Sequence, residues 1–210
     1  MDNNIIAREN AHHTAQKLLT DEFFFSLEED SAPFGNEDGL DAFNGFKQWH
    51  SKNKVNNSIQ YIHELLDELN YPEFDLHELD PEKIKEYIEQ KTESDNLSIN
   101  DQIPIMLDQI KQMASASGKE FDEDKIKEMM LGTSEDMGTT FLLGQDNSII
   151  AVAFGQLILE GRIDKGLHEL VEIALQRQLL PVLIDKWDEE YQEVRKAHLN
   201  KMLEVIKKVV

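Results

Sequence analysis

Apolar residues recur every three or four positions along most of this chain, which is the pattern of amphipathic α-helices. The clearest examples are the helices that we predict over 57–69, 80–88, 103–113, 164–175 and 191–209. Strict alternation of apolar and polar residues extends over no more than a few positions, so little β-structure is expected. The pattern predicts a mainly α fold, built as a bundle-like or orthogonal array of several helices.

Two apolar runs leave helix and strand open. The three phenylalanines at 23–25 fit a short buried strand, which would give one short strand pair near the N-terminus, or the end of a preceding helix. The run 149–159 is rich in Ile and Val, as strands are. Its length favours a buried central helix, with Asp146 as a candidate N-cap and Gly155 as a point of close helix approach.

A polar stretch at 90–96 is the best candidate for a domain boundary. It separates a predicted acidic, helical N-terminal subdomain at 1–95, which carries a loop at 31–39, from a predicted C-terminal helical bundle at 96–210. Both parts contain helices with one apolar face, so each has residues with which to build a core.

The chain contains 42 acidic and 21 basic residues, a formal net charge of −21, and 22 of the acids lie in the first hundred residues. Nucleic-acid phosphates and anionic lipids are bound mainly through Lys and Arg, so we expect neither nucleic acid nor a membrane surface as a partner. The same field attracts basic proteins and raises their association rate. A basic protein partner is therefore expected, although acidity for solubility alone is the simpler explanation.

Several classes of chemistry are excluded by what the sequence lacks. With no cysteine, it has no disulfides, no thiolate nucleophile and no Cys-ligated metal. It contains no phosphate-binding glycine loop and no Gly-x-Ser-x-Gly motif, so we expect no cofactor and assign no catalytic residue. We see no apolar leader at the N-terminus and no run of about 18 apolar residues, and we expect a cytoplasmic protein.

Three His-Glu-Leu triplets begin at His63, His77 and His168. A zinc site of the H-E-x-x-H type needs a second histidine four positions after the first, and none of the three has one. We interpret them as His–carboxylate pairs on solvated helix faces and predict no metal site.

The 31–39 loop supplies the candidate binding residues Phe34, Asn36, Glu37 and Asp38, and Trp49 lies on the helix that follows. Amide and carboxylate groups beside two aromatic rings are suited to a small polar site in an apolar frame. The alternative is that Asn36 or Asp38 caps the helix. The order of acids does not match a calcium loop of the EF-hand type.

Two blocks of the chain resemble a known group. Phe-Phe-Phe at 23–25, Ala-Pro-Phe-Gly-Asn at 32–36, Asp-Gly at 38–39 and Trp49 are similar to the opening of bacterial proteins of the YfeS type. The stretch 147–156, Asn-Ser-Ile-Ile-Ala-Val-Ala-Phe-Gly-Gln, resembles a block of related proteins. The resemblance implies a bacterial, cytosolic setting and no active site.

These observations favour an acidic protein-interaction module that binds a basic partner, for example as an immunity or antitoxin protein does. The alternatives are an enzyme that uses carboxylate and His chemistry around the 32–39 loop, with or without the assistance of a metal, and a housekeeping helical scaffold. A homodimer is compatible with all three hypotheses.

Overall fold

The computed structural model describes residues 6–53, 57–89, 104–114, 121–123, 125–126 and 137–209. These residues form α-helices and 3-10 helices and no strand, which confirms the mainly α fold. The chain divides into two compact units, one made of Met1–Ile84 with Phe141–Val210 and the other of Lys85–Thr140. The predicted boundary at 90–96 lies outside the described residues.

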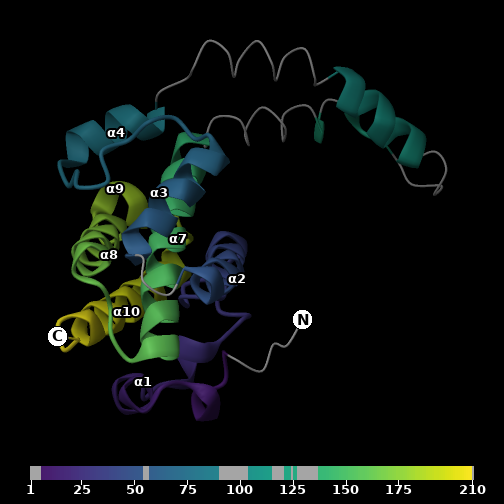
Figure 1. Cartoon of the computed structure of the whole chain (residues 1–210). Coiled ribbons are helices and arrows are strands. Elements are labelled where there is room, and N and C mark those ends of the chain that lie inside the picture. Colours follow the sequence, from purple (N-terminus) through teal and green to yellow (C-terminus); the bar gives the residue numbers. More distant parts are fainter. Residues whose placement is uncertain are drawn as a thin grey trace. The chain divides into compact units, whose positions relative to one another are not determined.

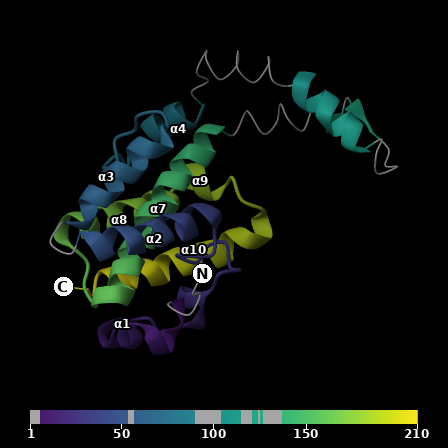
Figure 2. The same cartoon turned by 45° about the vertical axis from the view of Figure 1, so that its right-hand side comes forward.

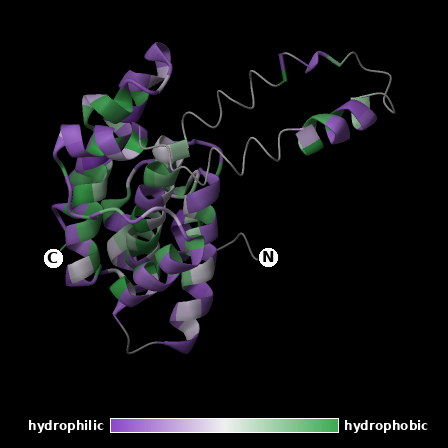
Figure 3. Ribbon diagram, turned by 90° about the horizontal axis from the view of Figure 1, so that it is seen from above, coloured by the Kyte–Doolittle hydropathy of each residue, from purple (hydrophilic) through white to green (hydrophobic). Residues whose placement is uncertain are grey.

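The helices follow one another along the chain as labelled in Figure 1, with a further helical segment at 104–114. Their bounds are η2 Arg8–Asn10, α1 His13–Leu18, η3 Glu22–Phe25, α2 Glu37–Lys52, α3 Ser58–Leu69, α4 Pro81–Glu89, α7 Met137–Glu160, α8 Lys165–Gln178, α9 Pro181–Ile184 and α10 Glu189–Ile206. Most of them carry both apolar and polar residues along their length (Figure 3), as amphipathic helices do.

Helix α7 forms the centre of the larger unit. Residues 149–158 are buried on every side of the helix, so the run that left helix and strand open is a core helix. By length and composition α7 is apolar enough to cross a membrane, which corrects the expectation that no segment reaches that limit. Of its most apolar window, 83% is buried inside the protein, as in a core helix.

Other helices pack on α7 at close range. A Cβ atom added to Gly155 would lie 2.3 Å from the ring of Phe43, so α2 approaches α7 where the side chain is absent. The backbone N–H of His12, just before α1, donates to the carbonyl of Ile158 at 2.7 Å. Helix α8 packs against α3, α9 and α10, and α2 packs against α3 (Figures 1 and 2).

The expected strand pair near the N-terminus does not form within the described residues. Residues 22–25 make the 3-10 helix η3 instead, and of its three phenylalanines only Phe24 is buried. The ring of Phe24 stacks on that of Phe154 in α7, with centroids 5.7 Å apart. A short turn is enough to insert one ring into the core, and no described strand is present to pair with this segment.

Two aspartates bind other partners than the start of their own helix, and one of them, Asp146, is a predicted cap that the structure corrects. Asp146 is not an N-cap, because α7 begins at Met137 and Asp146 lies inside the helix. Asp164 occupies the N-cap position of α8, but its carboxylate makes no cap hydrogen bond there. It accepts from the backbone N–H of Ser58 at 2.9 Å and so joins the start of α3 to the start of α8.

Candidate functional site

The 31–39 loop is anchored to the core through Phe34 and leads directly into α2. Phe34 is fully buried, and its ring lies 4.8 Å from that of Phe43 between centroids. Asn36 is the N-cap of α2, since its side-chain oxygen accepts from the backbone N–H of Gly39 at 2.8 Å. Glu37 follows in the first turn and is exposed to solvent. Asn36 therefore caps α2, which is the alternative to a binding role that the sequence left open for this loop.

The structure does not bring Asp38 and Trp49 together. They stand eleven residues apart in α2, which is about 16 Å along the helix at 1.5 Å per residue. Asp38 packs on Gly144 of α7, and burial, followed by neighbouring carboxylates, raises its pKa. Trp49 donates from its indole nitrogen to the Oε2 atom of Glu64 in α3 at 2.8 Å. The five predicted residues therefore divide between two places.

A fully buried ion pair lies beside α7, at a position where the sequence suggested a helix cap. Asp146 and Arg177 are both 0% exposed, and Arg177 donates to the two carboxylate oxygens at 3.2 and 2.5 Å. Its Nη1 atom also donates to the carbonyls of Leu76 and Glu78, at 3.0 and 2.9 Å. Burial raises the pKa of Asp146, and the guanidinium of Arg177 opposes that rise. Arg177 therefore fixes the backbone of 76–78 to α8.

A second arginine, Arg195 of α10, is only 2% exposed. Its guanidinium lies 4.0 Å above the ring of Trp187 and donates to the Oε1 atom of Gln178 at 2.8 Å. Its Nε and Nη1 atoms have no hydrogen-bond partner among the described residues. Among the residues that the structure describes, the interior thus holds two guanidinium groups and one carboxylate, that of Asp146, in the same region.

Polar side chains join the segment before α2 to α10. The hydroxyl of Ser31 lies 2.7 Å from Nδ1 of His198 and 3.0 Å from Oε1 of Glu29, and Tyr191 donates to the same Oε1 atom at 2.7 Å. Phe23 stacks on the imidazole of His198, with centroids 4.0 Å apart. Burial lowers the pKa of His198, and the hydrogen bond from Tyr191 lowers that of Glu29.

This cluster contains the residue types of a serine hydrolase but not their arrangement. In such enzymes the serine and the acid bind opposite nitrogens of the imidazole. Here Ser31 and Glu29 both approach Nδ1, Glu29 at 4.0 Å, and Ser31 is buried. The cluster therefore acts as a link between 29–31 and α10.

Acidic side chains are concentrated on residues 64–84, which we call the acidic segment. It contains eight acids and one basic residue, Lys83, and seven of the eight acids are exposed. Lys83 is paired with Glu78 at 2.7 Å. The basic residues of α10 do not neutralise the segment, because the described ion pairs of Lys196 and Lys201 are with Glu193 and Asp21.

A pocket of about 540 Å³ opens within the acidic segment, at the end of α3. It is lined by His63, Leu66, Asp67, Asn70, Tyr71, Pro72, Glu73, Phe74, Leu76 and Gln145. Asn70 gives the chain its turn there, since it takes the left-handed conformation at φ 51° after the last residue of α3. The pocket combines acidic groups with two aromatic rings, and burial raises the pKa of Tyr71, with a further contribution from Asp38.

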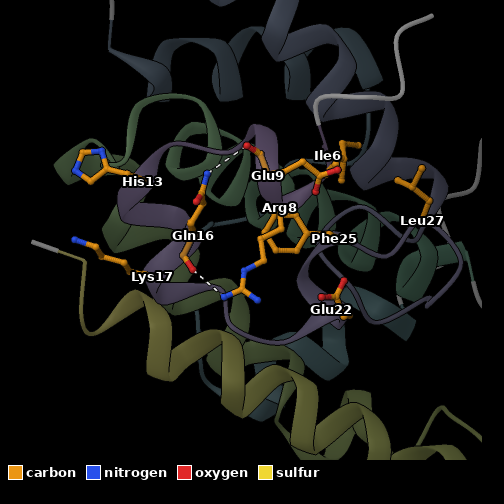
Figure 4. A pocket seen from close by; sticks show the side chains of 10 residues that line it. Ile6, Arg8, Glu9, His13, Gln16, Lys17, Glu22, Phe25 and Leu27 are labelled. Carbon is orange, nitrogen blue, oxygen red and sulfur yellow. Dashed lines mark hydrogen bonds between the residues drawn. The ribbon is translucent and has the colours of Figure 1, made fainter.

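The sequence indicated the charge of this region but not the pocket. The helix predicted over 57–69 ends just before this turn. The available signal was the pair of aromatic residues Tyr71 and Phe74 among the acids of the segment. A second cavity, of about 820 Å³, lies at the N-terminal side of the same unit and is lined by residues from 6 to 27 (Figure 4). The described residues include no group of three or more His, Asp and Glu side chains that could hold a metal ion.

Comparison with protein-family models, with curated proteins and with solved structures finds no match to the chain. The similarity to the YfeS type therefore stays a prediction.

Proposed function

We propose that this protein is an acidic interaction module that binds a basic protein partner through the acidic segment. An immunity-like or antitoxin-like role, in which the module covers the basic surface of its partner, is the most concrete form of the proposal. The observation that carries it is the pocket at the end of α3, whose lining includes the exposed acids Asp67 and Glu73 together with aromatic rings.

The chemistry of the pocket suits an arginine or a lysine of the partner. Asp67 and Glu73 provide carboxylates, and Tyr71 and Phe74 provide rings for the apolar stem and for cation–π contact. Phe74 already lies 5.1 Å from the guanidinium of Arg177, so this ring accepts a cation within the protein. Exposed carboxylates around the pocket would direct the encounter and make it sensitive to salt.

The backbone of the acidic segment is held in place before any partner arrives. Arg177 anchors the carbonyls of Leu76 and Glu78, and Trp49 binds Glu64 at the start of the segment. A surface that is already ordered loses little conformational entropy when it binds, which favours affinity. These internal contacts support a binding role for the segment.

Two matched pairs of substitutions test the proposal. Asp67→Asn with Glu73→Gln removes two charges from the pocket, and Asp185→Asn with Glu190→Gln removes two exposed charges elsewhere. A basic protein captured from a lysate at low salt would be purified, and its Kd measured for each form by calorimetry.

We expect the pocket pair to weaken binding about tenfold or more, which is 1.4 kcal/mol, and the distant pair to weaken it less than threefold. Equal losses for the two pairs would show that only the net charge is recognised. Retention of no basic protein at low salt would contradict the proposal itself.

A further inference from the structure

The cavity near the N-terminus differs from the acidic segment in the residues that line it. Its apolar side chains are Ile6, Phe25 and Leu27, and in Figure 4 Ile6 and Leu27 lie on the side opposite to His13 and Lys17. A volume of about 820 Å³ lies in the range of pockets that hold ligands of drug size, about 300–1,000 Å³. The cavity therefore has room for a small molecule and an apolar surface to contact it.

Four charged side chains line this cavity, and none of them has an ion-pair partner among the residues that the structure describes. They are the cations Arg8 and Lys17 and the anions Glu9 and Glu22. Arg8 is held by backbone carbonyls, since its Nη2 atom donates to Gln16 at 3.2 Å. Lys17 and Glu22 are exposed, and in Figure 4 they lie on opposite sides of Arg8.

We infer that this cavity binds a short peptide with free termini and an apolar side chain. Its carboxylate would pair with Lys17 and Arg8, its ammonium group with Glu22, and its side chain would contact Phe25 and Leu27. These are the charge-assisted hydrogen bonds and the apolar burial that the lining offers.

Other ligand classes fit the lining less well. A nucleotide or another polyanion would face the carboxylates of Glu9 and Glu22. A neutral apolar ligand would leave the charges of the lining without a partner of opposite sign. A zwitterion satisfies both signs of charge at once. The inference is independent of the acidic segment, which lies elsewhere in the sequence.

The test uses the tripeptide Leu-Ala-Leu and its N-acetylated, C-amidated form, titrated into the full chain by calorimetry. Lys17→Gln and Glu22→Gln each remove one exposed charge that makes no described contact, so both variants should fold. Lys165→Gln and Glu169→Gln are the matched controls on α8, away from the cavity.

We expect the free tripeptide to bind at least tenfold more tightly than the blocked form, and each cavity variant to lose at least fivefold. The control variants should bind as the parent protein does. Equal binding of the free and blocked peptides would overturn the inference, as would no heat of binding at millimolar peptide or equal losses in the control variants.

Discussion

Replacing Asp146 by Asn tests the buried charge balance of the larger unit. The substitution keeps the size of the side chain and removes the buried carboxylate that pairs with Arg177 and interacts electrostatically with Arg195. Two guanidinium groups would then remain in the interior without the carboxylate of Asp146. Removing one partner of a buried ion pair costs about 3–5 kcal/mol of unfolding free energy. This is a large part of a total stability of about 5–15 kcal/mol.

The corresponding fall in Tm is about 6–20 °C, at about 2–4 °C per kcal/mol for a chain of this size. Urea unfolding followed by tryptophan fluorescence reports on the larger unit, because both Trp49 and Trp187 belong to that unit. Asp185→Asn, at an exposed position, is the control and should change stability by less than about 0.5 kcal/mol.

A double variant separates charge from other effects. Arg177→Met in the Asp146→Asn background removes one of the two remaining cations. The double variant should therefore lose less stability than the sum of the losses of the two single variants, by at least about 1 kcal/mol. Arg177→Met will not restore all the stability that Asp146→Asn removes, because Arg177 also binds the carbonyls of Leu76 and Glu78. A cost below 1 kcal/mol for Asp146→Asn, or strict additivity in the double variant, would refute this account of the core.

Further predictions concern close packing and pH. Gly155→Ala should lower stability by about 1–3 kcal/mol in thermal unfolding, because the new methyl group would overlap the ring of Phe43; an unchanged Tm would contradict the packing of α2 on α7. Gly161→Ala should also destabilise, since Gly161 has a φ of 74°; a neutral result would show that this turn can rearrange. The pKa of His198 is lowered from 6.5 in the native protein, so the unfolded chain binds more protons and stability should fall as pH drops through about 6.5; His198→Asn should flatten that slope in unfolding measured from pH 7.5 to 5.5. The pKa of Glu29 is also lowered, so its contribution is lost only near and below its ordinary value of 4.5. A stability that increases as the pH falls from 7.5 to 5.5 would contradict the sign given for His198.

Local signals predicted much of the fold. The three-to-four spacing of apolar residues placed α3, α8 and α10, and Asn36 was one of two candidates for the cap that it forms on α2. Asp80 was expected to start α4, and its Oδ1 atom accepts from the N–H of Glu82 at 3.0 Å. Such features depend on residues within four positions of one another, which a sequence displays directly.

The buried polar contacts could not be predicted in the same way. Their charge predicts that Arg177 and Arg195 are exposed, because charged side chains are rarely fully buried without a partner. The partner Asp146 is 31 residues away from Arg177, so the sequence does not display the pair. The pair Ser31 and His198 is separated by 167 residues. For the candidate site, the acid content was visible in the sequence, whereas the pocket depends on how α3, α7 and the 71–76 turn meet.

The separation of Ser31 from His198 also has a consequence for biosynthesis. At about 5–20 residues per second, translation needs about 8–33 s to produce the 167 residues between them. For most of that interval α2 is already made. Helix α7, which supplies Gly155 against Phe43, is complete only at residue 160, and α10, which supplies His198 against Ser31, only at residue 206. The first helices therefore leave the ribosome with their apolar faces uncovered, and the nascent chain is open to chaperone binding or aggregation until its last helix is made.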